Sequence, residues 1–258
     1  MQKLISVDFQ ADFGFFRKPD TNNTINLSYT MLHKPALLGI LGAIIGLEGY
    51  QEFGELPEYY QKLKDVQIGV QPLNHDKGNF QKTTIKYSNT IGYANKGTNF
   101  LTEEVTLIQP AYRVYILLDT TQEAQAKLYT YLQEGKAEYI PYFGKNEFYA
   151  WWNRSSFQEY DYEANQQPQE SFKVKTLFLK DAVQMVKDQE ADAILDIFDL
   201  EDEELTFLYF ERLPMGFDET LNQYELGEFT YATFQFKENS AIQNLYFLKT
   251  HNYYVQLH

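Results

Sequence analysis

The sequence predicts an α+β protein whose first part mixes strands with helices and whose second part is mainly β. Strand and helix patterns alternate over the first 150 residues, and strand patterns dominate the remainder. Tyr (21) and Phe (20) are abundant, which is typical of β-rich structure and of flat contact surfaces. The 258 residues allow one large domain or two small ones. We expect a first domain over residues 1–150 and a second over residues 151–258.

The first part is expected to hold four strands and two helices. The strands are expected over residues 3–9, 66–70, 106–118 and 139–143, and the helices over residues 35–47 and 121–135. Together they follow the order β-α-β-β-α-β, which is the ferredoxin-like, or split βαβ, arrangement.

The helix expected over residues 35–47 is apolar on all sides, which indicates that it is buried. Small residues lie about four apart along it, and we expect them to let the helix sit close to a sheet: Gly39, Gly42, Ala43 and Gly46. Their spacing fits neither G-x-G-x-x-G nor a P-loop, so we exclude a nucleotide site of either kind.

Residues 71–101 form a long polar connection rich in Asn, Thr, Gly and Lys. A connection of this length inside a compact domain is usually functional or disordered. Strand-like ends at residues 83–87 and 98–101 predict a protruding β-hairpin arm, a thumb over about residues 71–104.

The second part is expected to be small and mainly β. Strand patterns over residues 172–179, 205–211, 226–236 and 245–255 surround a strongly acidic stretch at residues 181–204. Residues 199–204 are acidic but lack the alternating ligands and central glycine of an EF-hand, so we expect a solvated or docking surface and no metal.

The net charge of −14 argues against a free-standing nucleic-acid binder. The arm region is nevertheless locally basic, because residues 66–102 carry one acid, Asp76, against Lys77, Lys82, Lys86 and Lys96. This indicates that one face of the protein binds a polyanion and that other faces bind protein partners. The alternative is that the lysines only solubilise a loop.

The chain has no cysteine, which fits a reducing compartment and leaves no thiolate chemistry. Its first residues show no signal-peptide pattern, and the longest apolar run, residues 35–47, is too short to cross a bilayer. We expect a cytoplasmic protein without a membrane partner.

Residues 141–148 read Pro-Tyr-Phe-Gly-Lys-Asn-Glu-Phe. A glycine lets a backbone approach a ligand closely. Here Gly144 is flanked by aromatic residues and followed by Lys145 and Asn146. This mixture suits a sugar-phosphate backbone better than it suits acid/base chemistry.

Four stretches together resemble CRISPR-associated protein family five of the RAMP superfamily, and they are most similar to its type I-B subtype. They are residues 12–19 after the first strand, the helix opening at residues 34–47, the arm, and residues 139–148. The resemblance covers residues 1 to about 152 and implies a ferredoxin-like, RNA-recognition-motif-like domain with an inserted thumb hairpin, then a small β domain.

The resemblance also implies a role and a set of partners. Members of the family cap one end of the Cascade complex, hold the 5′ handle of the CRISPR RNA (crRNA), and contact the backbone subunit and the large subunit. Target DNA is then reached through the complex. Type I-B members generally do not process the guide, so no catalysis and no cofactor are expected.

On this basis we expect cations to hold phosphates and aromatic or amide groups to meet bases. Tyr87 or Tyr93 is a candidate for stacking, although packing within the hairpin is the alternative. A polar turn is the alternative for Lys145 and Asn146, and Trp151 and Trp152 are expected in the core or at a subunit interface. The full set of expected RNA-binding residues is Arg17, Lys18, His33, Lys34, Lys77, Lys82, Lys86, Tyr87, Asn89, Tyr93, Lys96, Gly144, Lys145, Asn146 and Phe148.

Two other functions stay open from the residues. A metal-independent endoribonuclease needs a base near a ribose 2′-OH and a cation, and His33 beside Lys34, with Tyr50, is the candidate group. The Lys-His pair of cleaving relatives is absent, since Lys145 and Asn146 hold that place. The third possibility is a β-rich protein-interaction module without RNA.

Overall fold

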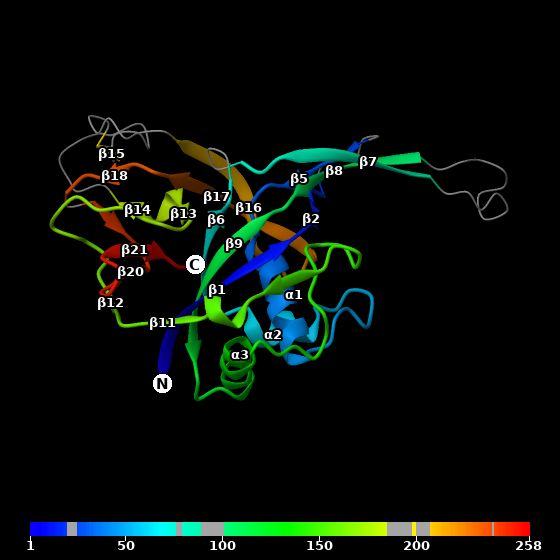
Figure 1. Cartoon of the computed structure of the whole chain (residues 1–258), viewed down its shortest axis with the longest axis horizontal. Coiled ribbons are helices and arrows are strands. Elements are labelled where there is room, and N and C mark those ends of the chain that lie inside the picture. Colours follow the sequence, from blue (N-terminus) through cyan, green and yellow to red (C-terminus); the bar gives the residue numbers. More distant parts are fainter. Residues whose placement is uncertain (20–24, 76–78, 89–100, 185–197, 200–206, 239) are drawn as a thin grey trace.

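The computed structural model describes residues 1–19, 25–75, 79–88, 101–184, 198–199, 207–238 and 240–258. The protein is α+β, with mostly strands, few helices and several sheets (Figure 1). No helix in these ranges is long and apolar enough to cross a membrane.

The largest sheet is built mainly from the first part of the chain. Its order is β10-β1-β9-β6 with every pair antiparallel, and a fifth strand, β11, also pairs with β1. The strands are β1 (Gln2–Ala11), β6 (Gln67–Leu73), β9 (Ala111–Asp119), β10 (Ala150–Trp152) and β11 (Gln158–Tyr160). The sheet thus reaches ten residues past residue 150, and the division into two domains there stays a prediction.

The fourth strand was expected over residues 139–143, and this is wrong. That segment holds only an isolated bridge between Tyr142 and Tyr149, because the chain folds back there and Phe143 N donates to Phe148 O at 2.8 Å. The edge of the sheet beside β1 is taken instead by β10, with Gln10 opposite Trp151.

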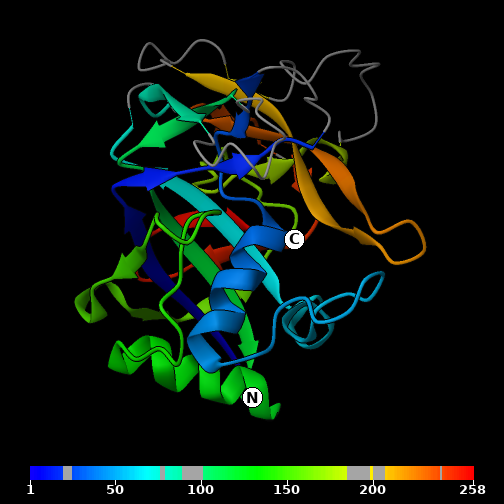
Figure 2. The ribbon, with the colours of Figure 1, turned by 90° about the vertical axis from the view of Figure 1, so that its right-hand side faces the viewer.

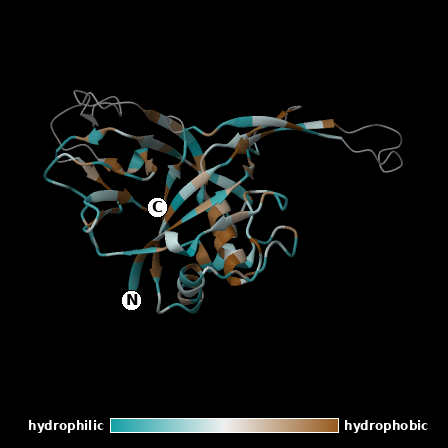
Figure 3. Cartoon of the chain, viewed as in Figure 1, coloured by the Kyte–Doolittle hydropathy of each residue, from teal (hydrophilic) through white to brown (hydrophobic). Residues whose placement is uncertain are grey.

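Helices α1 (Lys34–Ile45) and α3 (Glu123–Glu134) pack against one face of this sheet, and α2 (Glu58–Leu63) lies beside α1 (Figure 2). Figure 3 shows α1 as hydrophobic over most of its length, in line with its buried position. Ile5, Val7 and Phe9 of β1 share one core cluster with Leu37 of α1 and Leu128 of α3.

The small residues of α1 were expected to face the sheet, but Gly39 and Gly42 face α2 instead. A Cβ on Gly42 would lie 2.3 Å from the Cβ of Tyr59 on α2. A Cβ on Gly39 would lie 3.6 Å from Cζ of the Tyr59 ring. These glycines therefore let α2 approach α1, whereas larger side chains such as Leu38 and Ile44 fill the core.

The expected arm is present as an antiparallel hairpin of β7 (Lys82–Ser88) and β8 (Leu101–Ile108), which extends away from the body (Figure 1). The strand expected over residues 106–118 is broken, since β8 ends before Gln109 (φ 47°) and Pro110, and β9 begins after them. The first loop adds short strands next to the arm: β2 (Phe13–Gly14), β3 (Phe16–Arg17), β4 (Ile25–Asn26) and β5 (Ser28–Tyr29).

The second part is mainly β, as expected, and forms several small sheets. The long hairpin of β16 (Leu208–Asp218) and β17 (Gln223–Ala232) pairs with β13 (Phe178–Leu179), and β12 (Tyr162–Ala164), β20 (Leu245–Leu248) and β21 (Tyr253–Gln256) form a second sheet. The remaining elements are η1 (Arg154–Ser156), η2 (Lys180–Ala182), β14 (Val183–Gln184), β15 (Phe198–Asp199), β18 (Gln235–Phe236) and β19 (Ala241–Ile242).

The face of the large sheet opposite the helices is covered over part of its area by the β20–β21 hairpin. Leu4, Tyr115 and Tyr160 are buried there against Leu248 and Val255. RNA-recognition motifs stack bases on aromatic residues of an open sheet face. This part of the sheet is closed to that mode of binding.

Candidate nucleic-acid interface

Three separate stretches of the chain meet at the base of the arm: the first loop (residues 12–19, after β1), strand β8 and the loop of residues 143–148. Strand β2 pairs with β8, with Phe13 opposite Ile108 and Gly14 opposite Leu107. Phe15 N then donates to Phe143 O at 3.0 Å. Stretches that bear the family resemblance are therefore brought together in space.

Gly144 is required by this junction and not by a ligand. Its φ of 84° lies in the left-handed region, and a Cβ there would lie 1.9 Å from the carbonyl oxygen of Phe15. The close backbone approach that the sequence indicates is real, but the approaching group is the first loop of the same chain.

Lys145 binds carboxylates of its own chain. Its Nζ lies 2.7 Å from Oε2 of Glu104 on β8 and 3.3 Å from Oε1 of Glu147, and it sits 4.1 Å from the ring centre of Tyr87. Burial lowers the pKa of Lys145, but the hydrogen bonds that its ammonium group donates to Glu104 and Tyr87 outweigh this effect, and the pKa is raised overall. The ammonium group is therefore a charged clamp between this loop and the arm.

The described lysines of the arm also have partners. Lys82 Nζ donates to Thr30 Oγ1 at 3.0 Å. Lys86 lies directly opposite Glu103 on β8, 2.8 Å away, with 75% of its side chain exposed. An exposed pair of this kind is weak and exchanges partners easily, so Lys86 remains able to meet a phosphate.

The two cations of the first loop differ. Arg17 is exposed and forms no ion pair with any residue that the structure describes. Lys18 Nζ is 2.9 Å from Oε1 of Glu211, a buried carboxylate on β16 that also accepts from the backbone N–H of Thr30. Lys18 thus fastens the first loop to the second part of the chain.

His33 and Lys34 both serve the fold at the start of α1. His33 is buried and caps the helix, because its Nδ1 accepts from Ala36 N at 3.3 Å. Burial lowers the pKa of His33 to about 3, so the ring is neutral near pH 7. Lys34 Nζ donates to the carbonyl oxygen of His258 at 3.1 Å, and burial lowers its pKa to about 8.

Phe148 is buried with its ring 5.7 Å from that of Phe13, so it closes the loop and is not available for stacking. Asn146 is exposed. The other expected binding residues lie outside the described residues: Lys77, Asn89, Tyr93 and Lys96.

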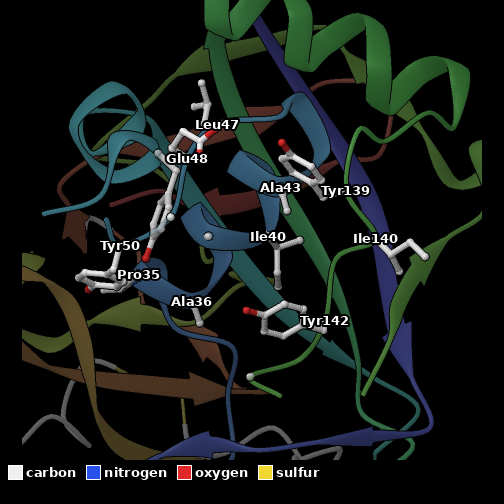
Figure 4. Close-up of a pocket in the computed structure, with 14 residues that line it drawn as sticks. Pro35, Ala36, Ile40, Ala43, Leu47, Glu48, Tyr50, Tyr139, Ile140 and Tyr142 are labelled. Carbon is white, nitrogen blue, oxygen red and sulfur yellow. The ribbon is translucent and has the colours of Figure 1, made fainter. Parts of the chain in front are cut away.

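A pocket of about 470 Å³ lies over the small residues of α1 and next to Gly144 (Figure 4). Tyr139 and Tyr142 stand on one side of it, Tyr50 on the other, and Tyr59 also lines it. The position of Tyr139 is fixed because Glu138 N and Tyr139 N donate to Ile44 O and Ala43 O, two carbonyls in the last turn of α1.

The pocket was not found from the sequence, because its tyrosines come from three separate segments. The only signal was the small-residue spacing of α1, which we assigned to sheet packing. Sequence reasoning also missed Glu104 and Glu211, which neutralise two of the expected binding cations. Charge at the described interface is balanced, since Arg17, Lys18, Lys82, Lys86 and Lys145 stand against Asp12, Glu103, Glu104, Glu147 and Glu211.

No protein-family model matches the chain, and no curated protein matches it in sequence. Among solved structures, the chain is similar to a chain of a CRISPR RNA-guided surveillance complex, with a TM-score of 0.47, 12% identity and 90% of each chain covered. It is also similar to a CRISPR protein from Archaeoglobus fulgidus, with a TM-score of 0.45, 12% identity and coverage of 98% and 97%. A third similar chain belongs to a type III-B Cmr-beta complex bound to target RNA and AMPPnP (TM-score 0.42, 13% identity, coverage 92% and 86%).

Proposed function

We propose that this chain is a non-catalytic, RNA-binding subunit of a type I-B CRISPR Cascade complex that holds the 5′ handle of the crRNA. In this role it bridges the backbone and large subunits and reaches target DNA only through the complex. The observation that carries the proposal is the meeting of the first loop, the arm and residues 143–148, three of the four stretches that resemble family five, at one junction.

We interpret the fold in the same terms. The strand order β10-β1-β9-β6, with α1 and α3 as the two crossover helices on one face, is the order expected of a ferredoxin-like arrangement. The β7–β8 hairpin is inserted between its second and third strands, where the thumb of the family is expected. Residues 151–258 are then the small β domain.

Binding in this proposal relies on few cations and several flat rings. Arg17 and Lys86 are exposed and are the described cations best placed to meet phosphates. Tyr50, Tyr139 and Tyr142 are between 41% and 60% exposed around the α1 pocket and offer faces on which splayed bases can stack. Because the charges of the described interface residues balance, these residues give little net electrostatic attraction, and shape and stacking carry more of their contribution to the affinity.

We also propose that the chain cleaves no RNA. A metal-independent cleavage needs a base within hydrogen-bonding reach of a 2′-OH. The candidate base, His33, is 3% exposed and uses Nδ1 as a helix cap, and the neighbouring Lys34 is bound to the His258 carbonyl.

The test is to purify the chain with co-expressed repeat RNA and sequence any RNA that is retained. The proposal predicts retained RNA with one uniform 5′ end, and no new product when the isolated chain meets repeat RNA in EDTA. Cleavage in EDTA would establish the nuclease instead. Purification without RNA, and no binding of handle RNA, would favour the protein-interaction module.

A further inference from the structure

A second pocket, of about 510 Å³, lies at the base of the arm on the face of the large sheet opposite α1. The faces are distinguished by residues 151 and 152. Trp152 packs against Phe9 and donates from Nε1 to Leu132 O of α3, on the helix side. Trp151, next in the strand, therefore points to the other face, where it is 41% exposed.

Side-chain amides are the commonest polar groups that line this pocket. Five amides line it together with Trp151, from four segments that are far apart in sequence: Gln10, Asn74, Asn79, Gln81 and Gln109. None of these side-chain amides has a hydrogen-bond partner among the described residues, and all five are exposed. Among the described residues, Asp12 is the one charged residue that lines the pocket, and no described lysine or arginine does.

Backbone hydrogen bonds hold several of the segments that line the pocket. Gln109 N donates to Asp12 O at 2.8 Å, and Ile108 N donates to Gln81 O at 2.8 Å. Asn74 and Gln109 sit in the left-handed region, with φ of 53° and 47°. Phe80 also lines the pocket, where its side chain is 5% exposed and packs on the ring of Tyr112. Backbone geometry thus positions Asn74, Gln81 and Gln109, and strand β1 positions Gln10, while their side-chain amides have no hydrogen-bond partner among the described residues.

The ordering of residues across the sheet places stacking and hydrogen-bonding groups side by side. Gln10 of β1 is directly opposite Trp151 of β10 on one side and Ala111 of β9 on the other. Directly opposite residues have Cβ atoms about 5 Å apart. A flat group resting on the indole would therefore have the Gln10 amide at its edge, above the small side chain of Ala111.

We propose that this pocket binds one unpaired nucleobase of RNA, with Trp151 as the stacking surface and the amides as readers of the base edge. The inference rests on the proposed RNA-binding function and adds a second contact, on the opposite face of the sheet from the α1 pocket. The described lining offers an indole and five amides, which suit a base better than a phosphate. Asp12 accepts hydrogen bonds and repels a carbonyl, so the base carries an exocyclic amino group, and adenine, with its larger ring, is favoured over uracil.

The test uses the two tryptophans of the chain. In a Trp152→Phe background, Trp151 is the sole indole, and titration with single-stranded oligo(A) quenches its fluorescence more strongly than oligo(U) does. In the otherwise native chain, Trp151→Ala lowers the affinity for oligo(A) by roughly 5- to 160-fold, the range for loss of one base–aromatic stack. The slope of log affinity against log salt stays unchanged, because a base contact releases no counterions.

Specificity provides an independent readout. Asp12→Asn and Gln10→Leu reduce the preference for oligo(A) over oligo(U) toward unity. The matched control is Phe210→Ala, which removes an aromatic side chain that is 52% exposed on β16, away from the pocket, and leaves affinity and preference unchanged.

The outcomes separate the two proposals. RNA binding by the native chain with no Trp151 quenching and no effect of Trp151→Ala overturns the pocket and leaves the RNA-binding function standing. No binding to any RNA overturns both. If Trp151→Ala weakens assembly with a protein subunit while oligo(A) affinity is unchanged, the surface is a protein contact and the base pocket is refuted.

Discussion

Lys145 Nζ lies 2.7 Å from Oε2 of Glu104, and this contact joins the loop of residues 143–148 to the base of the arm. The two side chains are 21% and 14% exposed, and the rings of Phe15, Tyr87 and Phe148 surround the ammonium group. Lys145, which the sequence suggested for a phosphate, therefore holds the base of the arm against the loop of residues 143–148.

Lys145→Met should therefore lower the free energy of unfolding by about 1 to 2 kcal/mol, because the mostly buried Glu104 carboxylate would lose its charged partner. Urea denaturation measures this. Lys64→Met is the matched control, since it removes a solvent-exposed pair with Glu219 and should change nothing measurable. Equal stability of Lys145→Met and the native chain would contradict the clamp.

Gly144→Ala should destabilise the protein by more than about 3 kcal/mol or prevent folding, because the new Cβ meets the Phe15 carbonyl in a left-handed backbone conformation. Gly49→Ala is the control, since a Cβ there meets nothing within 4 Å. Thermal unfolding of the two variants compares them directly. A Gly144→Ala protein that folds normally but loses RNA would restore the ligand-approach interpretation.

Stability should fall on acidification because of buried histidines. Burial lowers the pKa of His33 and of His258 to about 3, Lys34 also lowering that of His258. Below about pH 6.5 the unfolded chain binds protons at these rings and the folded chain does not, so the free energy of unfolding drops by up to about 1.4 kcal/mol per pH unit for each ring.

The His33→Asn variant tests this directly. Asn can still cap α1, so the variant should fold, with the slope of stability between about pH 6.5 and 5 reduced by roughly half. An unchanged slope in His33→Asn would mean that the ring is protonated in the folded protein.

Arg17→Glu combined with Lys86→Glu should weaken the binding of handle RNA and leave the fold intact, because both side chains are exposed. Each lost phosphate contact reduces the slope of log affinity against log salt by about 0.7. Filter binding over a salt series measures both effects. Lys237→Glu reverses an exposed cation in the second part of the chain and serves as the control. Identical slopes for all three proteins would remove these two residues from the interface.

Much of the fold could be predicted because it depends on local patterns. The apolar run of α1, the strand patterns of β1, β6 and β9, and the polar connection that forms the arm all appear near their expected positions. The fourth strand could not be located from pattern alone. Residues 139–143 have the right composition, but hydrogen bonds to the end of α1 hold Tyr139 there, and Phe9–Ala11 pair with the next suitable segment.

The segments that form the candidate site could be predicted from the sequence, but the roles of individual side chains in it could be predicted less well. Residue types alone do not show that Lys145 has a carboxylate 41 positions earlier, or that Lys18 has one nearly two hundred positions later. Such pairs depend on the register of β8 and on the position of β16. Trp151 was expected in the core or at a subunit interface. It is half-exposed and so is not a core residue, and the five amides beside it come from segments whose proximity the sequence does not show.

The central claim is that the arm and the first loop hold the leading nucleotides of a guide RNA. A density map of the particle that contains this chain tests it most directly. The account predicts the 5′ end of the RNA against Arg17 and strand β7, with intact RNA and no cleaved product. A map that places the arm in solvent or against protein alone, with the RNA 5′ end held by another subunit, would contradict it.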